Sequence, residues 1–206
     1  MKRIFLFALA LVCVFGTTAC KKQEKQDTTF LGKIKGDKYE NKLLGFGFTL
    51  PTGWTFYSDD ELREMNDADE DMSLQEYAKQ MAEEDVLYVM FAVDAQTGRS
   101  VNIVLEKVGY SGPNIKTAEE YMRNSITGLK AAFEELGVES VTAHHIEVSL
   151  AGEKVPGVKL TCHLPNGIMY ERVLCKRAGD YFVCITIANT GADTPVDILN
   201  QFYSLD

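Results

Sequence analysis

The alternation of hydrophobic and polar residues is clearest in residues 43–56. In residues 46–50 large apolar side chains alternate with Gly and Thr, which is the two-residue period of a strand with one buried face. Pro51 has no N–H to give to a sheet, so we expect the strand to end there and the chain to turn through Gly53. Trp54, the only tryptophan, follows directly. We therefore predict that this stretch lies at the centre of the core.

Other strands are predicted wherever apolar residues alternate or run without interruption. The run from Val86 to Val93 is apolar throughout, which is typical of a strand covered on both faces. Asn166-Gly167 stands between two alternating runs and predicts a tight hairpin. The predicted strands are residues 38–41, 45–50, 86–93, 101–106, 158–164, 168–176 and 181–188, with one or two more in 138–150.

Three capping boxes mark the starts of helices. Each places a Ser or Thr three residues before a Glu, so that side chains and backbone satisfy one another's hydrogen bonds at the helix N-terminus. Thr194 followed by Pro195 indicates one more helix start. The predicted helices are residues 58–65, 73–83, 117–136 and 195–203. The side chains expected on their buried faces are Leu74, Tyr77, Ala78 and Met81, then Tyr121, Met122, Ile126, Leu129, Phe133 and Leu136, and finally Val196, Leu199 and Phe202.

These elements together predict an α+β fold. Helices flank one antiparallel sheet in an α/β/α sandwich, and a single domain covers residues 37–206. The order of elements and the pattern Phe46-x-Phe48-x-Leu50-Pro51-x-Gly53-Trp54 resemble bacterial relatives of the Mog1 and PsbP-like fold over residues 38–206. That family includes a nuclear-transport factor that binds a small GTPase, a photosystem accessory subunit and bacterial lipoproteins without assigned roles. The resemblance implies binding and assembly roles, but a shared fold carries no activity across.

The amino-terminal residues differ in character from the rest. A short basic start, an apolar run and small residues predict an export signal over residues 1–19. The signal ends before Cys20, an arrangement that resembles the lipobox of bacterial lipoproteins, in which this cysteine is lipidated. The alternative is ordinary secretion with Cys20 as a plain thiol. Residues 20–36 are lysine-rich and predict a flexible tether. We expect an extracytoplasmic protein of the bacterial cell envelope, anchored to the membrane through Cys20.

Charge narrows the class of partner. Without Lys2 and Arg3 of the signal, 19 basic residues face 30 acidic ones, a net charge of about −11. Nucleic-acid binding needs a basic stripe that contacts phosphates, and no block of Lys or Arg follows the tether. Nucleic acid is therefore excluded as the expected partner.

Three cysteines of the predicted domain, Cys162, Cys175 and Cys184, lie in apolar strand patterns. An odd number permits at most one internal disulfide and leaves a thiol over. We predict that all three are small buried hydrophobic side chains. The alternative is a bridge from Cys175 to either Cys162 or Cys184 in a neighbouring strand.

One cluster of aspartates contains the residue types that bind calcium, but the residues around it do not complete a calcium-binding loop. Asp67, Asp69 and Asp71 match the start of an EF-hand calcium loop. Met72 stands where that loop requires glycine, and Ala78 stands where it requires a bidentate glutamate. We therefore interpret the cluster as a solvated loop between two helices.

The histidines show no catalytic arrangement either. His144 and His145 are adjacent, so in a strand they point to opposite faces and do not share a metal. His163 as a base for a cysteine nucleophile would have to reach Cys175 or Cys184, which we place on the other face of the sheet.

The sequence thus names no catalytic, cofactor or metal site, because no nucleophile, base and orienting group converge in any motif. Cys20 is the one residue with an expected role, lipid attachment. We expect a non-catalytic binding or accessory protein whose partner is a protein or a cell-envelope component. The alternatives are a membrane-anchored hydrolase or thiol enzyme, and a small-ligand carrier. A polar cleft would indicate the enzyme, an apolar cavity the carrier, and an exposed apolar patch the accessory protein.

Overall fold

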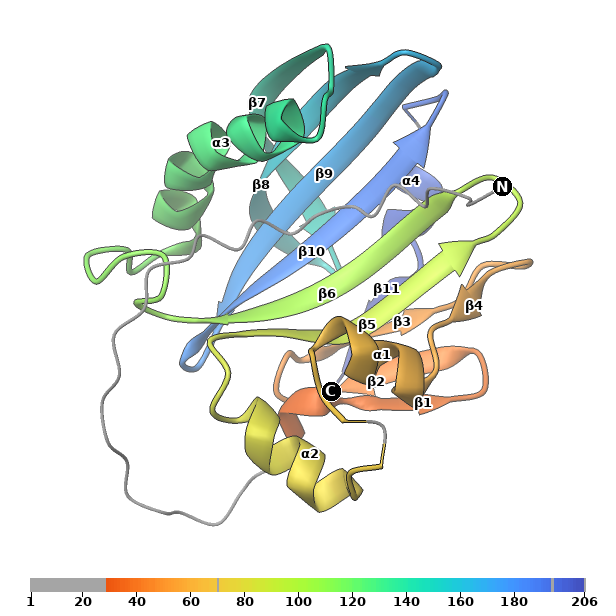
Figure 1. Cartoon of the computed structure of the whole chain (residues 1–206), viewed down its shortest axis with the longest axis vertical. Helices are drawn as coiled ribbons and strands as arrows, with labels where there is room; N and C mark the ends of the chain where they lie inside the picture. The colour runs from red at the N-terminus through yellow and green to blue at the C-terminus, as the bar shows by residue number, and fades with distance from the viewer. Residues whose placement is uncertain (1–28, 70, 194, 206) are drawn as a thin grey trace.

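The computed structural model describes residues 29–69, 71–193 and 195–205 (Figure 1). The predicted signal, Cys20 and the first part of the tether lie outside these residues. Within them, mixed helix and strand content and entirely antiparallel pairing confirm the predicted α+β class. The expectation of one sheet is wrong, because the strands form two. No helix among the described residues is long and apolar enough to cross a membrane.

The larger sheet has seven strands in the order β4-β5-β6-β10-β9-β8-β7. They are β4 Thr55–Phe56, β5 Val86–Asp94, β6 Arg99–Lys107, β7 Ser140–Leu150, β8 Glu153–Leu164, β9 Gly167–Ala178 and β10 Tyr181–Thr190. The last four follow one another as the predicted meander, and β10 pairs with β6 to join the meander to the first half of the chain. The apolar run predicted to be covered on both faces is β5, and most of its side chains are buried.

The smaller sheet has four strands in the order β1-β2-β3-β11. They are β1 Lys33–Lys35, β2 Lys38–Asn41, β3 Phe46–Thr49 and β11 Phe202–Ser204. The strands β2 and β3 are the predicted first hairpin. The predicted helix 195–203 is wrong beyond its first turn, since α4 covers only Val196–Leu199. Phe202 instead pairs with Phe48 in the sheet, and their ring centroids lie 4.8 Å apart. Pairing with β3 buries the Phe202 side chain and also gives hydrogen-bond partners to the backbone N–H and C=O groups of β11.

The smaller sheet also shortens the predicted tether. Residues 29–36 form the 3-10 turn η1 Thr29–Leu31 and the strand β1. Phe30 is buried, and its carbonyl accepts a hydrogen bond of 2.8 Å from the buried Asn41 Nδ2. Burial of Phe30 and pairing with β2 thus order a segment whose lysine content alone suggested a flexible chain.

The helices are α1 Asp59–Met65, α2 Leu74–Met81, α3 Ala118–Glu135 and α4. All three predicted capping boxes are present, at Ser58, Ser73 and Thr117. Three side chains expected to be buried are not, since Leu74, Leu136 and Val196 are 62%, 53% and 63% exposed. Each stands at or just beyond the end of its helix, where the apolar face of the helix is no longer covered by the rest of the protein.

Two cores lie on the two faces of the larger sheet (Figure 1). The helix α3 packs on β7, β8 and β9 and buries residues such as Met122 and Phe133. The other face is covered by the smaller sheet together with α2 and α4. Trp54 is buried in this second core, as predicted, after a turn in which Gly53 has φ 86°.

Candidate functional site

A groove with a volume of about 370 Å³ lies between β1 and the helices α1 and α2. We call it the β1 groove. Besides β1 itself, its walls include Tyr39 of β2, Leu62 and Arg63 of α1, Leu74 and Tyr77 of α2, and Tyr88 and Val89 of β5.

Two glycines shape the β1 side of the groove. Gly32 has φ 71°, and a Cβ there would lie 2.6 Å from the ring of Tyr39, so only glycine lets the chain cross that ring. Gly36 has φ 61° and begins the two-residue turn between Lys35 and Lys38, which pair with each other. Glycine at the first central position is typical of the type II′ hairpin. β1 is therefore held in a defined conformation as one strand of a hairpin with β2.

Two polar side chains of the walls, those of Arg63 and Tyr39, have partners within the protein. Arg63 donates a hydrogen bond of 2.7 Å to the carbonyl of Met72, and its guanidinium lies 4.8 Å from the centre of the Tyr77 ring. The Tyr39 hydroxyl donates to the carbonyl of Leu31 at 3.4 Å. These contacts fix the walls, so the groove offers a ligand its apolar side chains and the charged Lys33, Lys35 and Asp59.

Ile34 and Leu74 give the groove its exposed apolar character. They are 37% and 62% exposed, and they belong to the five large apolar side chains that are most exposed among the described residues. Two of the five therefore line one groove. Clustered exposed apolar groups are typical of binding surfaces, whereas single ones are ordinary.

Asn66 lies behind the wall and supports two of its residues, Tyr77 and Tyr88. Its side-chain oxygen accepts from the backbone N–H of Tyr88 at 2.8 Å, and Nδ2 donates to the carbonyl of the same residue at 2.9 Å. Nδ2 also lies 2.9 Å from the Tyr77 hydroxyl oxygen, to which it donates. This amide takes the place of a neighbouring strand and ties α1, α2 and β5 together.

The acidic cluster singled out in the sequence lies in the loop that joins α1 to α2. Asp69 Oδ1 accepts from the backbone N–H of Asp71 at 3.2 Å, and Asp67 has φ 51°. Within the described residues no group of three or more His, Cys, Asp or Glu side chains is arranged to hold a metal ion.

The three domain cysteines are free and buried, which confirms the predicted state. All belong to the core between α3 and the larger sheet. Cys175 stands directly opposite Cys184 on β9 and β10. Burial, together with the charge of Glu171, raises the pKa of the Cys162 thiol to about 12. Burial also raises the pKa of the Cys175 thiol, so these two thiols lack the thiolate character of a nucleophile.

The histidines are exposed and do not approach the thiols. His163 follows Cys162 on β8, so it points to the face opposite the cysteine core. His144 and His145 lie on β7, opposite Lys159 and Val158. The structure thus separates the residue types that a thiol enzyme needs.

Two buried carboxyl groups were not singled out by the sequence. Glu106 accepts a hydrogen bond of 2.7 Å from the Tyr121 hydroxyl, and burial raises its pKa. Burial raises the pKa of Glu171 to about 8, and its Oε2 has no hydrogen-bond partner among the described residues. The sequence could have revealed Glu171, because it lies two residues from both Met169 and Val173 in an alternating strand and so shares their buried face. Neither acid lines the β1 groove.

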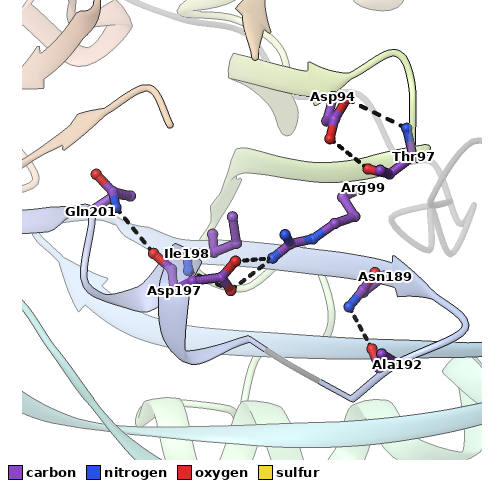
Figure 2. A network of polar contacts seen from close by, with 8 residues as sticks. All are labelled: Asp94, Thr97, Arg99, Asn189, Ala192, Asp197, Ile198 and Gln201. Carbon is purple, nitrogen blue, oxygen red and sulfur yellow. Dashed lines mark hydrogen bonds and ion pairs between the residues drawn. The ribbon is translucent and has the colours of Figure 1, made fainter. Parts of the chain in front are cut away.

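Ion pairs at the other end of the sheet fasten the segment that follows β10. Asp193 pairs with Lys159 of β8 and Arg172 of β9. Burial raises the pKa of Asp193 and the two hydrogen bonds lower it, with a net shift below its ordinary value. Figure 2 shows the adjoining network, in which Arg99 of β6 binds Asp197 of α4. These contacts hold α4 and the segment between β10 and α4 against the larger sheet.

Similarity to known proteins gives no indication of function for this chain. No protein-family model matches the chain, and no curated protein is significantly similar to it.

The residues that carry the candidate site were not expected from the sequence. Ile34 fell in the predicted tether, and Leu74 was assigned to a buried helix face. A signal was present, because Lys33-Ile34-Lys35 alternates like a short strand and Gly36-Asp37 follows as a hairpin turn.

Proposed function

We propose that this chain is a lipid-anchored extracytoplasmic protein with a non-catalytic binding role. It recognises a protein or cell-envelope component through the β1 groove. The exposure of Ile34 and Leu74 in one groove carries this proposal, because apolar groups kept in solvent at one place are available to a partner.

The anchor and the groove are close along the chain. Eight residues lie between Cys20 and Thr29, and even fully extended this segment spans at most about 30 Å. A lipid on Cys20 would hold the groove near the membrane surface, which favours a partner at that surface. Labelling cells with a tagged fatty acid should mark the protein, and Cys20→Ser should abolish the label. Equal labelling of both forms would remove the anchor from the proposal.

The finer fold assignment is also a proposal. The helix α3 on one face and the short helices with the smaller sheet on the other support an α/β/α arrangement of the Mog1 and PsbP-like kind. An experimental structure superposed on members of that family tests it.

A small-ligand carrier is the second candidate function. The groove volume of about 370 Å³ falls within the range of roughly 300–1,000 Å³ common for small-molecule sites. An enzyme has less support, since the described thiols, histidines and buried acids do not converge at the groove.

Site-specific crosslinking in cells tests the binding role. A photoreactive amino acid at Lys35 should give a crosslink to one partner, and Leu74→Glu should remove it by placing a charge in the groove. A photoreactive residue at the remote Leu136 and the substitution Leu136→Glu provide matched controls, because that side chain is also exposed. A crosslink that survives Leu74→Glu, or that appears equally from position 136, would contradict recognition through the groove.

A further inference from the structure

We infer that the β1 groove binds an extended protein segment that pairs with β1 as an added strand and presents an apolar residue between two acidic ones. This inference rests on the proposed binding function and specifies the partner of the same site.

The backbone of β1 offers hydrogen bonds at its outer edge. β1 is the outermost strand of the smaller sheet, and Lys35 and Lys38 close the turn that joins it to β2. The closing pair of a two-residue hairpin exchanges both backbone bonds, so Ile34, the next residue, directs its N–H and C=O away from β2. Outside this hairpin Ile34 makes no hydrogen bond to any described residue. A segment lying along the edge would satisfy both groups.

The side chains of β1 define the pattern of the added strand. Ile34 stands opposite Tyr39, which is buried in the core, so the Ile34 side chain is on the groove side. Lys33 and Lys35 alternate to the outer side. A residue paired with Ile34 therefore places its side chain in the groove beside Leu74, and its two neighbours lie beside the lysines.

Charge complementarity selects acidic residues at the two neighbouring positions. The chain has a net charge of −9, yet Lys33, Lys35 and Lys38 share the outer side of this hairpin. Two acidic residues of the hairpin partly offset these three lysines, Glu40 opposite Lys33 and Asp37 in the turn, so the lysines remain in excess. Acidic side chains beside the lysines would be favoured as cross-strand neighbours.

The same charges argue against a second copy of the chain as the occupant. Antiparallel pairing of two β1 edges about Ile34 would place Lys33 of one copy opposite Lys35 of the other, and like charges in that position are destabilising. Lysines on an edge strand are also a general protection against unwanted pairing. Here they restrict pairing to an acidic segment. A small apolar ligand would use the groove but would leave the backbone edge and the lysines without a role.

Binding of a synthetic peptide tests the inference. The probe is a labelled, blocked nonapeptide of alternating glutamate and valine, titrated by fluorescence anisotropy with the purified full-length protein in mild detergent. Binding should weaken at least tenfold with Ile34→Pro, because proline lacks the outward N–H while an edge position tolerates it. Ile34→Ala, which keeps the N–H, should weaken binding less.

Charge reversal and a modified peptide test the same geometry independently. Lys33→Glu combined with Lys35→Glu should abolish binding and allow binding of a lysine and valine peptide, whereas the exposed Lys42→Glu on the β2–β3 turn should change nothing. A probe N-methylated at its valines should not bind the unmodified protein, because it lacks the N–H groups that would pair with β1. This test does not depend on whether the Ile34→Pro variant folds.

Several outcomes would overturn strand addition. They are no binding of the probe, equal binding of the N-methylated probe, or equal binding of the lysine peptide to the unmodified protein. Displacement of a bound apolar dye by fatty acid but not by the probe would assign the groove to a small ligand. If the probe fails while the crosslink from position 35 remains sensitive to Leu74→Glu, the binding function stands and only the strand-addition geometry is lost.

Discussion

Nη2 of Arg99 donates hydrogen bonds of 2.7 and 2.6 Å to the two carboxylate oxygens of Asp197, although the two residues are 98 positions apart in the sequence (Figure 2). The same guanidinium lies 5.7 Å from the centre of the Trp54 ring. Asp197 stands in the single turn of α4, just before β11 pairs with β3. This contact therefore fastens the end of the chain to the larger sheet over the buried tryptophan.

The two partners should contribute unequally to stability. Asp197 is largely in solvent, so Asp197→Ala should lower the free energy of unfolding by less than about 1 kcal/mol. Arg99 also covers the tryptophan ring, so Arg99→Ala should cost about 1 to 2 kcal/mol through lost packing and cation–π contact. Urea unfolding of both variants and of the double variant gives the coupling energy. Equal costs for the two single changes would show that only the ion pair matters.

Trp54 should be essential to the core. Trp54→Ala should destabilise the protein by roughly 3 to 5 kcal/mol, the usual scale for truncating a buried aromatic side chain. Thermal unfolding followed by circular dichroism measures the effect. Leu136→Ala, at an exposed helix end, is the control and should change stability by less than about 0.5 kcal/mol. An unchanged melting temperature for Trp54→Ala would assign the tryptophan to a surface contact.

Glu171 should make stability decrease as pH rises. Its pKa is about 8 in the folded protein against an ordinary value of 4.5, so between these values the folded state keeps a proton that the unfolded state releases. The stability linked to this proton is complete below pH 4.5 and is lost as pH rises towards about 8. Glu171→Gln should remove this dependence and at pH 7 raise the free energy of unfolding by about 1 to 3 kcal/mol.

Urea unfolding between pH 4.5 and 8.5 measures the difference between Glu171→Gln and the unmodified protein. The exposed Glu134→Gln provides a matched control that should leave the pH profile unchanged. A constant offset between the Glu171→Gln and unmodified curves would show that Glu171 titrates alike in the folded and unfolded states.

Asn66 should stabilise the wall of the β1 groove. Asn66→Ala removes both hydrogen bonds to the backbone of Tyr88 and should cost about 2 kcal/mol. The amide of Tyr88 should then exchange with solvent much faster, as measured by hydrogen exchange with NMR detection. Asn124→Ala, which removes one exposed bond to Glu120 within α3, is the comparison. Similar exchange at Tyr88 in both variants would mean that the edge of β5 is held by other contacts.

The sequence predicted the local elements well because their signals are local. The capping boxes at Ser58, Ser73 and Thr117 form as expected, since the bonded groups are three residues apart. The alternation around Phe46 and Phe48 predicted a strand before Trp54, because a two-residue period is the local signature of a strand, and β3 forms there. The three cysteines among the described residues are free, in agreement with their apolar surroundings.

The candidate site was missed because its parts meet only in the folded chain. Ile34 and Leu74 are 40 positions apart, and neither is unusual in its own segment. Phe202 was placed in a helix because nothing local shows that β3 needs a neighbour. Glu171 reads as a polar position until the sheet encloses it.

The sequence by itself thus determined the class of fold, the helix starts, most strands and the buried tryptophan, because backbone hydrogen bonding and side-chain periodicity act over a few residues. Only the tertiary structure decided that the strands divide into two sheets, that residues 29–36 belong to the domain, and that β1 is left as an open edge beside α1 and α2. Those features depend on which distant surfaces exclude water from one another, and that is settled when the whole chain packs.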